Sequence, residues 1–461
     1  MLLIKLAPLK IIWSYMKSDA ILKQDCSCVC RKGFSAFIYY AIKTLILATT
    51  IILSIVIDNP TQIRLALFYL LALNIFLVVI NRRCIYALIV SLFLLWFNYS
   101  IYFANYIYDI DNFFTTWAYS GVAIQGFKIV LVFTTVLSVF VKSDNVIIKN
   151  ENNKEKKPQL LNDDRPSYAI FGYCYLFLLL LLLIFGFSRP SELGGRGSVS
   201  SYYEYSTIVF IVGFYFFKWN KFYKYFSCVI LLLFAFQDLL YGGRVTALQL
   251  LLLLFVVVYD GKKIPWGKLF PIFILIFAIF AVVGSMRGNV KFTLNNLANS
   301  FFKSTQYGYT LDTAYSAYYT SLTFVDIQKN VGVWQRLSMF VSFLFSMILG
   351  GSFVKNSNLS VFTRQYYVHY YGGLLPFFGQ FYLGAFGVVL VGGLVVFYIN
   401  AMKAANSKSN GITRCVLIYI TISTPRWYLY SPSSLIRGVF LLSVVYYITL
   451  LATSSVEKKR G

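Results

Sequence analysis

The residues best suited to chemistry are arginines that border the apolar segments of the chain. Arginine is always charged, and its planar guanidinium binds phosphate oxygens through a fork of N–H groups. Several such groups on one face, next to lipid, would suit a phosphate-bearing ligand and would neutralise a pyrophosphate leaving group without a metal ion. The arginines in these positions are Arg189, Arg196, Arg244, Arg287, Arg336, Arg364, Arg426 and Arg437.

Four of these arginines recur at predicted helix mouths beside Gly, Tyr or Pro. Arg244 closes a Tyr-Gly-Gly-Arg turn, Arg287 lies in Ser-Met-Arg-Gly, and Arg426 follows Thr-Pro. Arg364 shares a Tyr-rich segment with the only histidine of the chain, His369. The alternative for any single interfacial arginine is a lipid-headgroup anchor. A set of four on the outer face, where basic residues are unexpected, favours a functional role.

Tyrosines accompany these arginines. Their flat, amphipathic rings would suit sugar rings by stacking and hydroxyl hydrogen bonds, and Tyr366 and Tyr367 stand between Arg364 and His369. A tyrosine at a membrane boundary also has the ordinary alternative of belonging to the aromatic belt. A lone histidine is more often a structural hydrogen-bonding residue than a base, but the basic, aromatic surroundings of His369 make a general base an equal alternative.

Several other classes of protein lack their sequence marks here. No Walker A run is present, so the chain is not an ATP-driven pump subunit, and a single histidine excludes an H-E-x-x-H zinc site. Cys26, Cys28 and Cys30 lack the usual ligand spacing, so we interpret them as free thiols and expect no metal site. A metal-dependent glycosyltransferase site is unsupported, because the outer carboxylates form no D-x-D or paired motif. These scattered carboxylates are Asp109, Asp111, Glu192, Glu204, Asp312 and Asp326.

The composition predicts that membrane helices position these residues. The chain has 461 residues, of which 59% are hydrophobic and 13% charged, too few charges to cover a soluble protein of this length. Most apolar blocks approach the roughly 20 residues that span a bilayer core as a helix. The predicted fold class is therefore all-α, a polytopic membrane protein with about 12 transmembrane helices. The apolar blocks include residues 34–57, 63–80, 84–108, 117–141, 168–187 and 245–259.

The distribution of basic residues predicts that both ends of the chain lie inside. With the N-terminus inside, 26 of the 41 lysines and arginines fall on inner segments, which is the positive-inside pattern. The expected organisation is an inner lead-in at 1–33, helices one to nine at 34–286 with a polar inner linker at 142–167, a large outer loop at 287–375, helices ten to twelve at 376–453, and an inner tail at 454–461.

One apolar run decides this topology. Residues 337–350 are apolar but short for a crossing, and a crossing there would place Lys403, Lys408 and Arg414 outside. We therefore interpret 337–350 as a re-entrant or buried helix of the outer loop.

Three segments share features with a known family. GGRVTALQLLLLLFVVVYDGKK is an outer Gly-Arg turn that enters an apolar helix, SMRGNV opens the outer loop, and GGLLPFFGQFYLGAFGVVLVGGLVVFY is similar to a Gly-rich return helix. In this arrangement, which covers most of residues 34–453, the chain resembles the bacterial O-antigen polymerases, or oligosaccharide repeat-unit polymerases. It departs from some members in lacking cleanly spaced Arg…Gly repeats in two outer loops. The resemblance implies a GT-C-like architecture.

The resemblance also implies a chemistry, metal-independent glycosyl transfer without a cofactor. A glycan on undecaprenyl pyrophosphate would be transferred to the non-reducing end of another lipid-linked repeat unit. The implied partners are this lipid-linked glycan, the bilayer and a chain-length regulator, with no nucleic acid, and the implied location is the bacterial inner membrane with the active face in the periplasm. On this hypothesis the pyrophosphate is bound by Arg244, Arg287 and Arg426. The acceptor is bound by Arg364 and His369, and His369 is the base, with Asp312 as fallback. Tyr366 and Tyr367 bind the glycan.

Other functions remain open on the sequence alone. An O-antigen ligase shares the donor, the long loop and the Arg/His chemistry, but transfers the glycan to lipid A-core. A lipid-linked oligosaccharide flippase or transporter would need a central polar cavity. Its basic residues should lie in mid-helix, where only Lys43 and Lys128 are expected, with Asp238 as the acidic residue at this depth.

Overall fold

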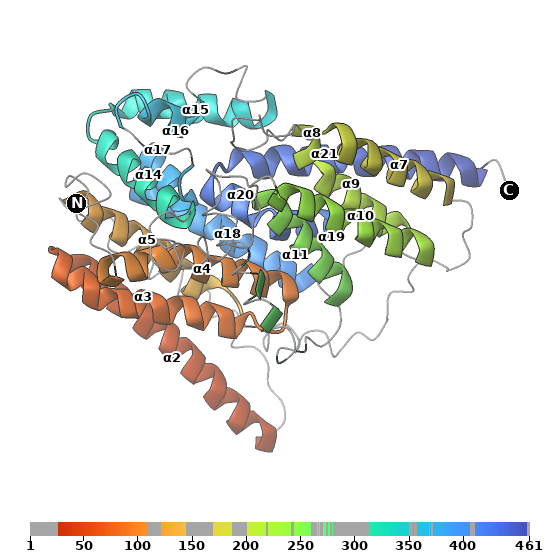
Figure 1. Ribbon diagram of the computed structural model, residues 1–461. Helices are drawn as coiled ribbons and strands as arrows, with labels where there is room; N and C mark the ends of the chain where they lie inside the picture. The colour runs from red at the N-terminus through yellow and green to blue at the C-terminus, as the bar shows by residue number, and fades with distance from the viewer. Residues whose placement is uncertain are drawn as a thin grey trace, which may run out of the picture. The chain divides into compact units, whose positions relative to one another are not determined.

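The structure, a computed structural model, describes residues 26–107, 121–143, 169–186, 201–217, 220–240, 244–259, 313–349, 357–367, 372–405 and 411–458, and the single residues 265, 267, 271, 272, 275, 276, 279, 354 and 369. All regular elements in this part of the chain are helices (Figure 1). They are α2 (Cys26–Val56), α3 (Pro60–Ile80), α4 (Ile85–Ile107), α5 (Gly121–Phe140), α7 (Ala169–Phe185), α8 (Ser201–Glu204), α9 (Ser206–Phe217), α10 (Lys221–Leu240), α11 (Val245–Tyr259), α14 (Thr313–Gln328), α15 (Val333–Leu349), α16 (Leu359–Thr363), α17 (Leu375–Leu383), α18 (Ala385–Ala405), α19 (Ile412–Ile422), α20 (Thr424–Leu429) and α21 (Ser433–Lys458).

The chain is a helical membrane protein. Five described helices are long and apolar enough to cross a bilayer, and seven shorter apolar helices of 10–17 residues accompany them. Many of these helices expose large apolar side chains, among them Leu65, Phe185 and Leu451, as expected where the solvent is lipid. The five long segments are Ile38–Val56, Gly121–Phe140, Lys221–Leu239, Ala385–Ala404 and Ser433–Ser454.

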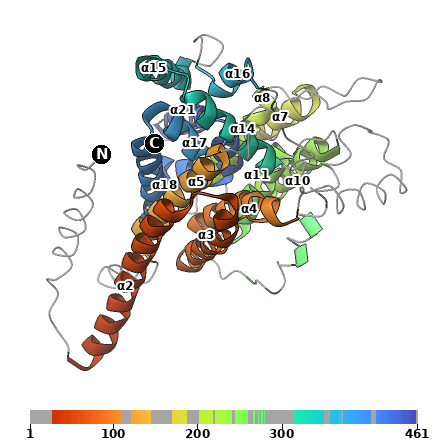
Figure 2. The same cartoon turned by 90° about the vertical axis from the view of Figure 1, so that its left-hand side faces the viewer.

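Two compact units divide the chain, Met1–Ile51 and Ile52–Gly461. Within the second unit the helices pack as two groups (Figures 1 and 2). The first group contains α3, α4, α5, α14, α17 and α18, and the second contains α7, α9, α10, α11, α19 and α21 around one aromatic and aliphatic core. Helix α20 contacts α4 and α17 of the first group and α11, α19 and α21 of the second, so it lies where the two groups meet.

Helix α20 is separate because of the residues at its ends. Helix α19 ends at Ile422, and Pro425 lies in the first turn of α20. Proline has no N–H to continue the preceding helix, but its fixed φ suits the start of a new one. Tyr430 then ends α20 before α21 begins at Ser433. The local sequence thus creates a six-residue helix between two longer ones.

Helix α14 lies deeper than its place in the predicted outer loop suggests. It packs against α4, α5 and α17, and its Thr320, Ser321 and Thr323 are buried. The Ser321 and Thr323 hydroxyls donate to the carbonyls of Ala317 and Thr320, at 2.6 Å in each case. A hydroxyl-rich helix can be buried in this way, because it satisfies its own polar groups. Part of the expected loop is therefore a packed component of the first helix group.

The apolar run expected as the tenth helix is divided into two. Helix α17 ends at Leu383, Gly384 adopts a φ of 66°, and α18 begins at Ala385. A Cβ placed on Gly387 would lie 2.0 Å from the carbonyl oxygen of Gly379. In one straight helix these residues would be about 12 Å apart, so the contact requires a hairpin in which α17 and α18 pack backbone against backbone.

Residues 337–350, the run on which the predicted topology depends, fall largely within α15. This helix is about 25 Å long at 1.5 Å per residue, shorter than a bilayer core of about 30 Å. One face, with Met339 and Phe343, is buried against α17 and α21, and the other, with Phe345 and Ile348, is exposed. A re-entrant or buried position for this helix stays a prediction.

Three parts of the chain meet at one end of the first group. The Lys403 ammonium donates to the carbonyl oxygens of Ile80, at 3.2 Å, and of Lys142. The side-chain oxygen of Asn400 accepts from the backbone N–H of Lys142 at 2.9 Å. These bonds hold together the end of α3, the residue Lys142 after α5 and the last turns of α18.

Candidate functional site

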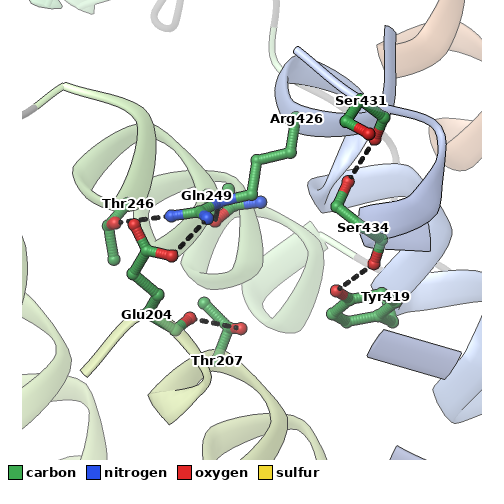
Figure 3. Close-up of polar contacts among 8 residues, drawn as sticks. All are labelled: Glu204, Thr207, Thr246, Gln249, Tyr419, Arg426, Ser431 and Ser434. Carbon is green, nitrogen blue, oxygen red and sulfur yellow. Dashed lines mark hydrogen bonds and ion pairs between the residues drawn. The ribbon is translucent and has the colours of Figure 1, made fainter. Parts of the chain in front are cut away.

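Arg426 is held at the junction of the two helix groups by three polar side chains (Figure 3). Its Nη1 donates to Glu204 Oε2 at 2.7 Å. Its Nε donates to Gln249 Oε1 at 3.1 Å, and its Nη2 donates to Thr246 Oγ1 at 3.2 Å. Figure 3 shows the side chain reaching from blue α20 to green α11 and yellow-green α8. The guanidinium therefore has a fixed orientation.

The partners of Arg426 come from two helix ends. Thr246 and Gln249 are three residues apart near the start of α11, so both side chains lie on one face of that helix. The start of α11 is itself fixed by Asp238 of α10, whose Oδ2 accepts from the backbone N–H of Ala247 at 3.0 Å. A carboxylate at a helix N-terminus is stabilising. Asp238, expected as a polar residue at mid-membrane depth, therefore has a structural role in the described contacts.

The Arg426–Glu204 ion pair is partly buried and partly exposed. The Arg426 side chain is 21% exposed and that of Glu204 is 33% exposed. The three bonds to described residues use three of the five N–H groups of the guanidinium. The other two N–H groups are the ones that an anionic ligand would take.

A second guanidinium contributes to the electrostatics of this site. The hydroxyl of Tyr419 on α19 donates to the carbonyl oxygen of Ser434 at 3.4 Å and lies in the field of Arg426, Arg437 and Glu204. Ser434 in turn donates to the carbonyl of Ser431, in the turn between α20 and α21 (Figure 3). Arg426 and Arg437 thus bring positive charge to the same hydroxyl-lined region.

The other predicted pyrophosphate residues are placed in part. Arg244 precedes α11, and its carbonyl accepts from the N–H of Leu248 in the first turn of that helix. It stands two residues before Thr246, which contacts Arg426 directly. The backbone of Arg244 and the side chain of Arg426 therefore both lie at the start of α11. Arg287, and the fallback base Asp312, lie outside the described residues.

His369 is buried and lies against the end of α16. It is 7% exposed, and its Nε2 lies 2.9 Å from the hydroxyl of Thr363. The same hydroxyl is 3.3 Å from the carbonyl oxygen of Ser360, to which it donates. Both bonds form together when Nε2 carries the proton, which leaves a lone pair on Nδ1. Arg364, the other predicted acceptor residue, lies exposed in the turn after α16.

Two glycines join the His369 segment to the helix of Arg426. Gly372 and Gly373 have φ values of 119° and 148°, a region that favours glycine. The N–H of Gly373 donates to the carbonyl of Leu429, the last residue of α20, at 2.8 Å. A Cβ on Gly372 would lie 2.7 Å from the same carbonyl oxygen. The backbone after His369 is therefore fastened about one helical turn from Arg426.

The two predicted glycan-binding tyrosines differ in their surroundings. Tyr366 is 65% exposed and lies edge-on to Phe362, with ring centroids 5.6 Å apart. Tyr367 donates its hydroxyl to Asp326 Oδ2 of α14 at 2.8 Å. Partial burial and, secondarily, this hydrogen bond raise the pKa of Tyr367 to about 12. The hydroxyl is therefore protonated at neutral pH and acts as the donor.

Two arginines of the predicted outer boundary hold α15 against its neighbours. Arg336 donates to the carbonyl of Phe381 in α17 at 3.3 Å. Arg437 donates to the carbonyl of Ser346, near the other end of α15, at 3.2 Å. Arg437 therefore combines a structural contact with its effect on Tyr419.

Sequence reasoning missed several members of the site. Glu204 was one of the scattered outer carboxylates, and Asp326 another. Neither carries a spacing signal, because its partner lies far away in sequence. Thr246 and Gln249 could have been found as polar residues on one face of a leucine-rich helix. No three His, Cys, Asp or Glu side chains among the described residues are grouped to hold a metal ion.

Comparison with models of known protein families, with curated protein sequences and with solved structures found no match.

Proposed function

We propose that the chain is a membrane glycosyltransferase that polymerises undecaprenyl-pyrophosphate-linked oligosaccharide repeat units into O-antigen or a related surface polysaccharide. In the full proposal the chain crosses the bacterial inner membrane about 12 times, in a GT-C-like architecture, and acts on the periplasmic face. The resemblance of three sequence segments to repeat-unit polymerases supports this proposal, together with the charge at the outer boundary of the helices.

The observation that carries the proposal is the fixed guanidinium of Arg426 where two helix groups meet. A donor pyrophosphate develops negative charge as its bond to the sugar breaks, and preoriented N–H donors stabilise that charge without reorganising. Arg426 is held by Glu204, Gln249 and Thr246 in such an orientation. Arg437 adds positive charge nearby. In the proposal Arg244 and Arg287 complete the pyrophosphate site.

The proposed reaction is a displacement at the anomeric carbon of the donor. A hydroxyl oxygen of the acceptor sugar forms the new bond, the bond to the pyrophosphate oxygen breaks, and the hydroxyl proton passes to a base. In the proposal His369 is this base, with Asp312 as fallback, and Arg364 positions the acceptor. The bond from Nε2 of His369 to Thr363 would orient the ring.

The sharpest test separates a structural ion pair from a pyrophosphate site. The variants are Arg426→Gln, Glu204→Gln and the double substitution. Removing one partner of a partly buried pair destabilises the protein, whereas neutralising both restores much of the stability. We expect the double variant to recover its unfolding midpoint but not its activity, measured as polymer formed from synthetic undecaprenyl-pyrophosphate-linked repeat unit by purified protein. Full activity in a double variant that has recovered its stability would show that Arg426 takes no part in the reaction.

The same substrates separate the polymerase from its alternatives. A ligase would transfer the glycan to lipid A-core but would not join repeat units to one another. A flippase would move the lipid-linked glycan across vesicles without forming any polymer. In cells, loss of a polymerase leaves a single capped repeat unit, whereas loss of a ligase leaves none.

A further inference from the structure

A carboxylate on the predicted outer loop is partly exposed and held in a fixed orientation. Asp326, near the end of α14, is 31% exposed. Its Oδ2 accepts from the hydroxyl of Tyr367, and its Oδ1 lies 3.4 Å from the ammonium of Lys329. A carboxylate offers about four acceptor positions, so these two contacts fix its orientation and leave room for further donors.

An exposed aromatic ring belongs to the same turn as the tyrosine that binds this carboxylate. Tyr366 precedes Tyr367 in the chain and exposes most of its side chain, while Phe362 supports its ring from α16. Helix α16 packs against α14, the helix of Asp326 (Figures 1 and 2). The polar side chains Arg364 and Gln365 are exposed in the same turn. The turn after α16 thus combines an exposed ring and exposed polar side chains with the tyrosine that orients the Asp326 carboxylate.

The chemistry of this cluster favours a neutral polyol. The carboxylate repels an anion, and it lies within 3.4 Å of the competing charge of Lys329, which disfavours a metal cation. The hydroxyls of a sugar donate to carboxylate oxygens in charge-assisted hydrogen bonds, and its apolar C–H face packs on a tyrosine ring. None of these residues belongs to the contacts of Arg426.

From this geometry we propose that Asp326, Tyr366 and Tyr367 form a glycan-binding subsite separate from the Arg426 site. Asp326 binds sugar hydroxyls, Tyr367 holds the carboxylate in place, and Tyr366 stacks on the sugar ring. The subsite deepens the proposed function, on which it rests for its role: it would hold the sugars of the acceptor. Its ligand class is a pyranose oligosaccharide without the lipid pyrophosphate.

The test measures sugar binding directly. The full chain is placed in lipid nanodiscs, because alkyl-glycoside detergents carry sugar head groups that would compete. Saturation-transfer NMR is recorded with three neutral probes, namely hexoses, N-acetylhexosamines and 6-deoxyhexoses as free di- and trisaccharides. The variants are Asp326→Asn, Tyr367→Phe and Tyr366→Ala. The matched control is Gln365→Ala, an exposed neighbour in the same turn.

We expect at least one probe to bind the wild-type chain. Asp326→Asn should weaken that binding about tenfold, the factor that corresponds to 1.4 kcal/mol. Tyr366→Ala should weaken it similarly, Tyr367→Phe less, and Gln365→Ala hardly at all. Each variant is first shown to fold, by a single cooperative unfolding transition above the temperature of the binding assay. Tyr367→Phe, which preserves the ring, provides the test of the subsite if another variant fails to fold. No binding of any probe, or equal binding by wild type and Asp326→Asn, would overturn the subsite.

The outcomes distinguish the subsite from the proposed function. Arg426→Lys should keep glycan binding but lose polymer formation. Glycan binding that depends on Asp326, in a chain that forms no polymer, would leave the subsite in place and refute the polymerase. If Asp326→Asn forms polymer like the wild type and no glycan binds, the subsite is refuted and the polymerase proposal is kept.

Discussion

The substitution Gly387→Ala tests the helical hairpin of α17 and α18. The added Cβ would lie 2.0 Å from the carbonyl oxygen of Gly379 and 2.6 Å from its carbonyl carbon. Ordinary contacts between nonbonded carbon atoms are about 3.5–4.0 Å, and both atoms of Gly379 belong to the backbone, which cannot rotate away as a side chain can. The two helices must therefore separate by more than about 1 Å.

The expected loss of stability follows from two opposing effects. Overpacking in a close-packed interior costs about 1–3 kcal/mol. Replacing glycine by alanine within a helix returns roughly 0.5–1 kcal/mol. Because the clash is between backbones, we expect the upper half of the overpacking range and a net loss of about 1–2.5 kcal/mol. The free energy of unfolding would be measured by denaturant titration in mixed micelles, with tryptophan fluorescence as the signal.

Gly393→Ala is the matched control on the same helix. No atom lies within 4 Å of a Cβ at that position, so only the helix-propensity gain of roughly 0.5–1 kcal/mol applies. The two variants should therefore move the free energy of unfolding in opposite directions. If Gly387→Ala is as stable as Gly393→Ala, the chain at Gly384 does not reverse as described and the run is one continuous helix.

Two further changes test contacts elsewhere in the chain. Lys403→Met removes the ammonium that binds the carbonyls of Ile80 and Lys142 and should lower the free energy of unfolding by about 1–3 kcal/mol. The exposed control Lys329→Met should change it by no more than about 0.5 kcal/mol. Tyr367→Phe should alter the pH dependence of stability. Because the folded pKa of Tyr367 is raised to about 12, its stabilising contribution is complete below the ordinary pKa near 10 and is lost as the pH rises toward 12. The gap in unfolding free energy between wild type and Tyr367→Phe should therefore shrink between about pH 8 and about pH 11, and a constant gap would contradict the assignment.

The sequence predicted the helices well where apolar length alone decided them. The runs that form α3, α5 and α21 are continuous and almost free of charge, and the structure has helices there. It did not predict the burial of α14, because a helix rich in Thr, Ser and Tyr has the composition of a surface segment. Its burial depends on hydroxyls that bond their own backbone, which no hydropathy pattern reports. The reversal at Gly384 was missed for a similar reason, since glycine within an apolar run is common in membrane helices.

Of the candidate site, the sequence predicted the arginines but not the residues that bind them. Arg426 stands out as a cation beside proline at the end of an apolar run, and the structure places it where two helix groups meet. Its partner Glu204 is 222 residues away in sequence. A contact over such a distance depends on the packing of whole helices, so one sequence cannot reveal it. The roles assigned to Arg287 and Asp312 stay predictions.

The position of α20 has a mechanical consequence. This short helix is tied to α11 through Arg426 and to the segment 372–374 through Leu429, and it also packs on α4. Any sliding of one helix group past the other must therefore stretch or break a contact of α20. A ligand that took the remaining N–H groups of Arg426 would tighten this joint. Binding of a ligand at the site would then slow amide hydrogen exchange in both α4 and α11, on the two sides of the junction.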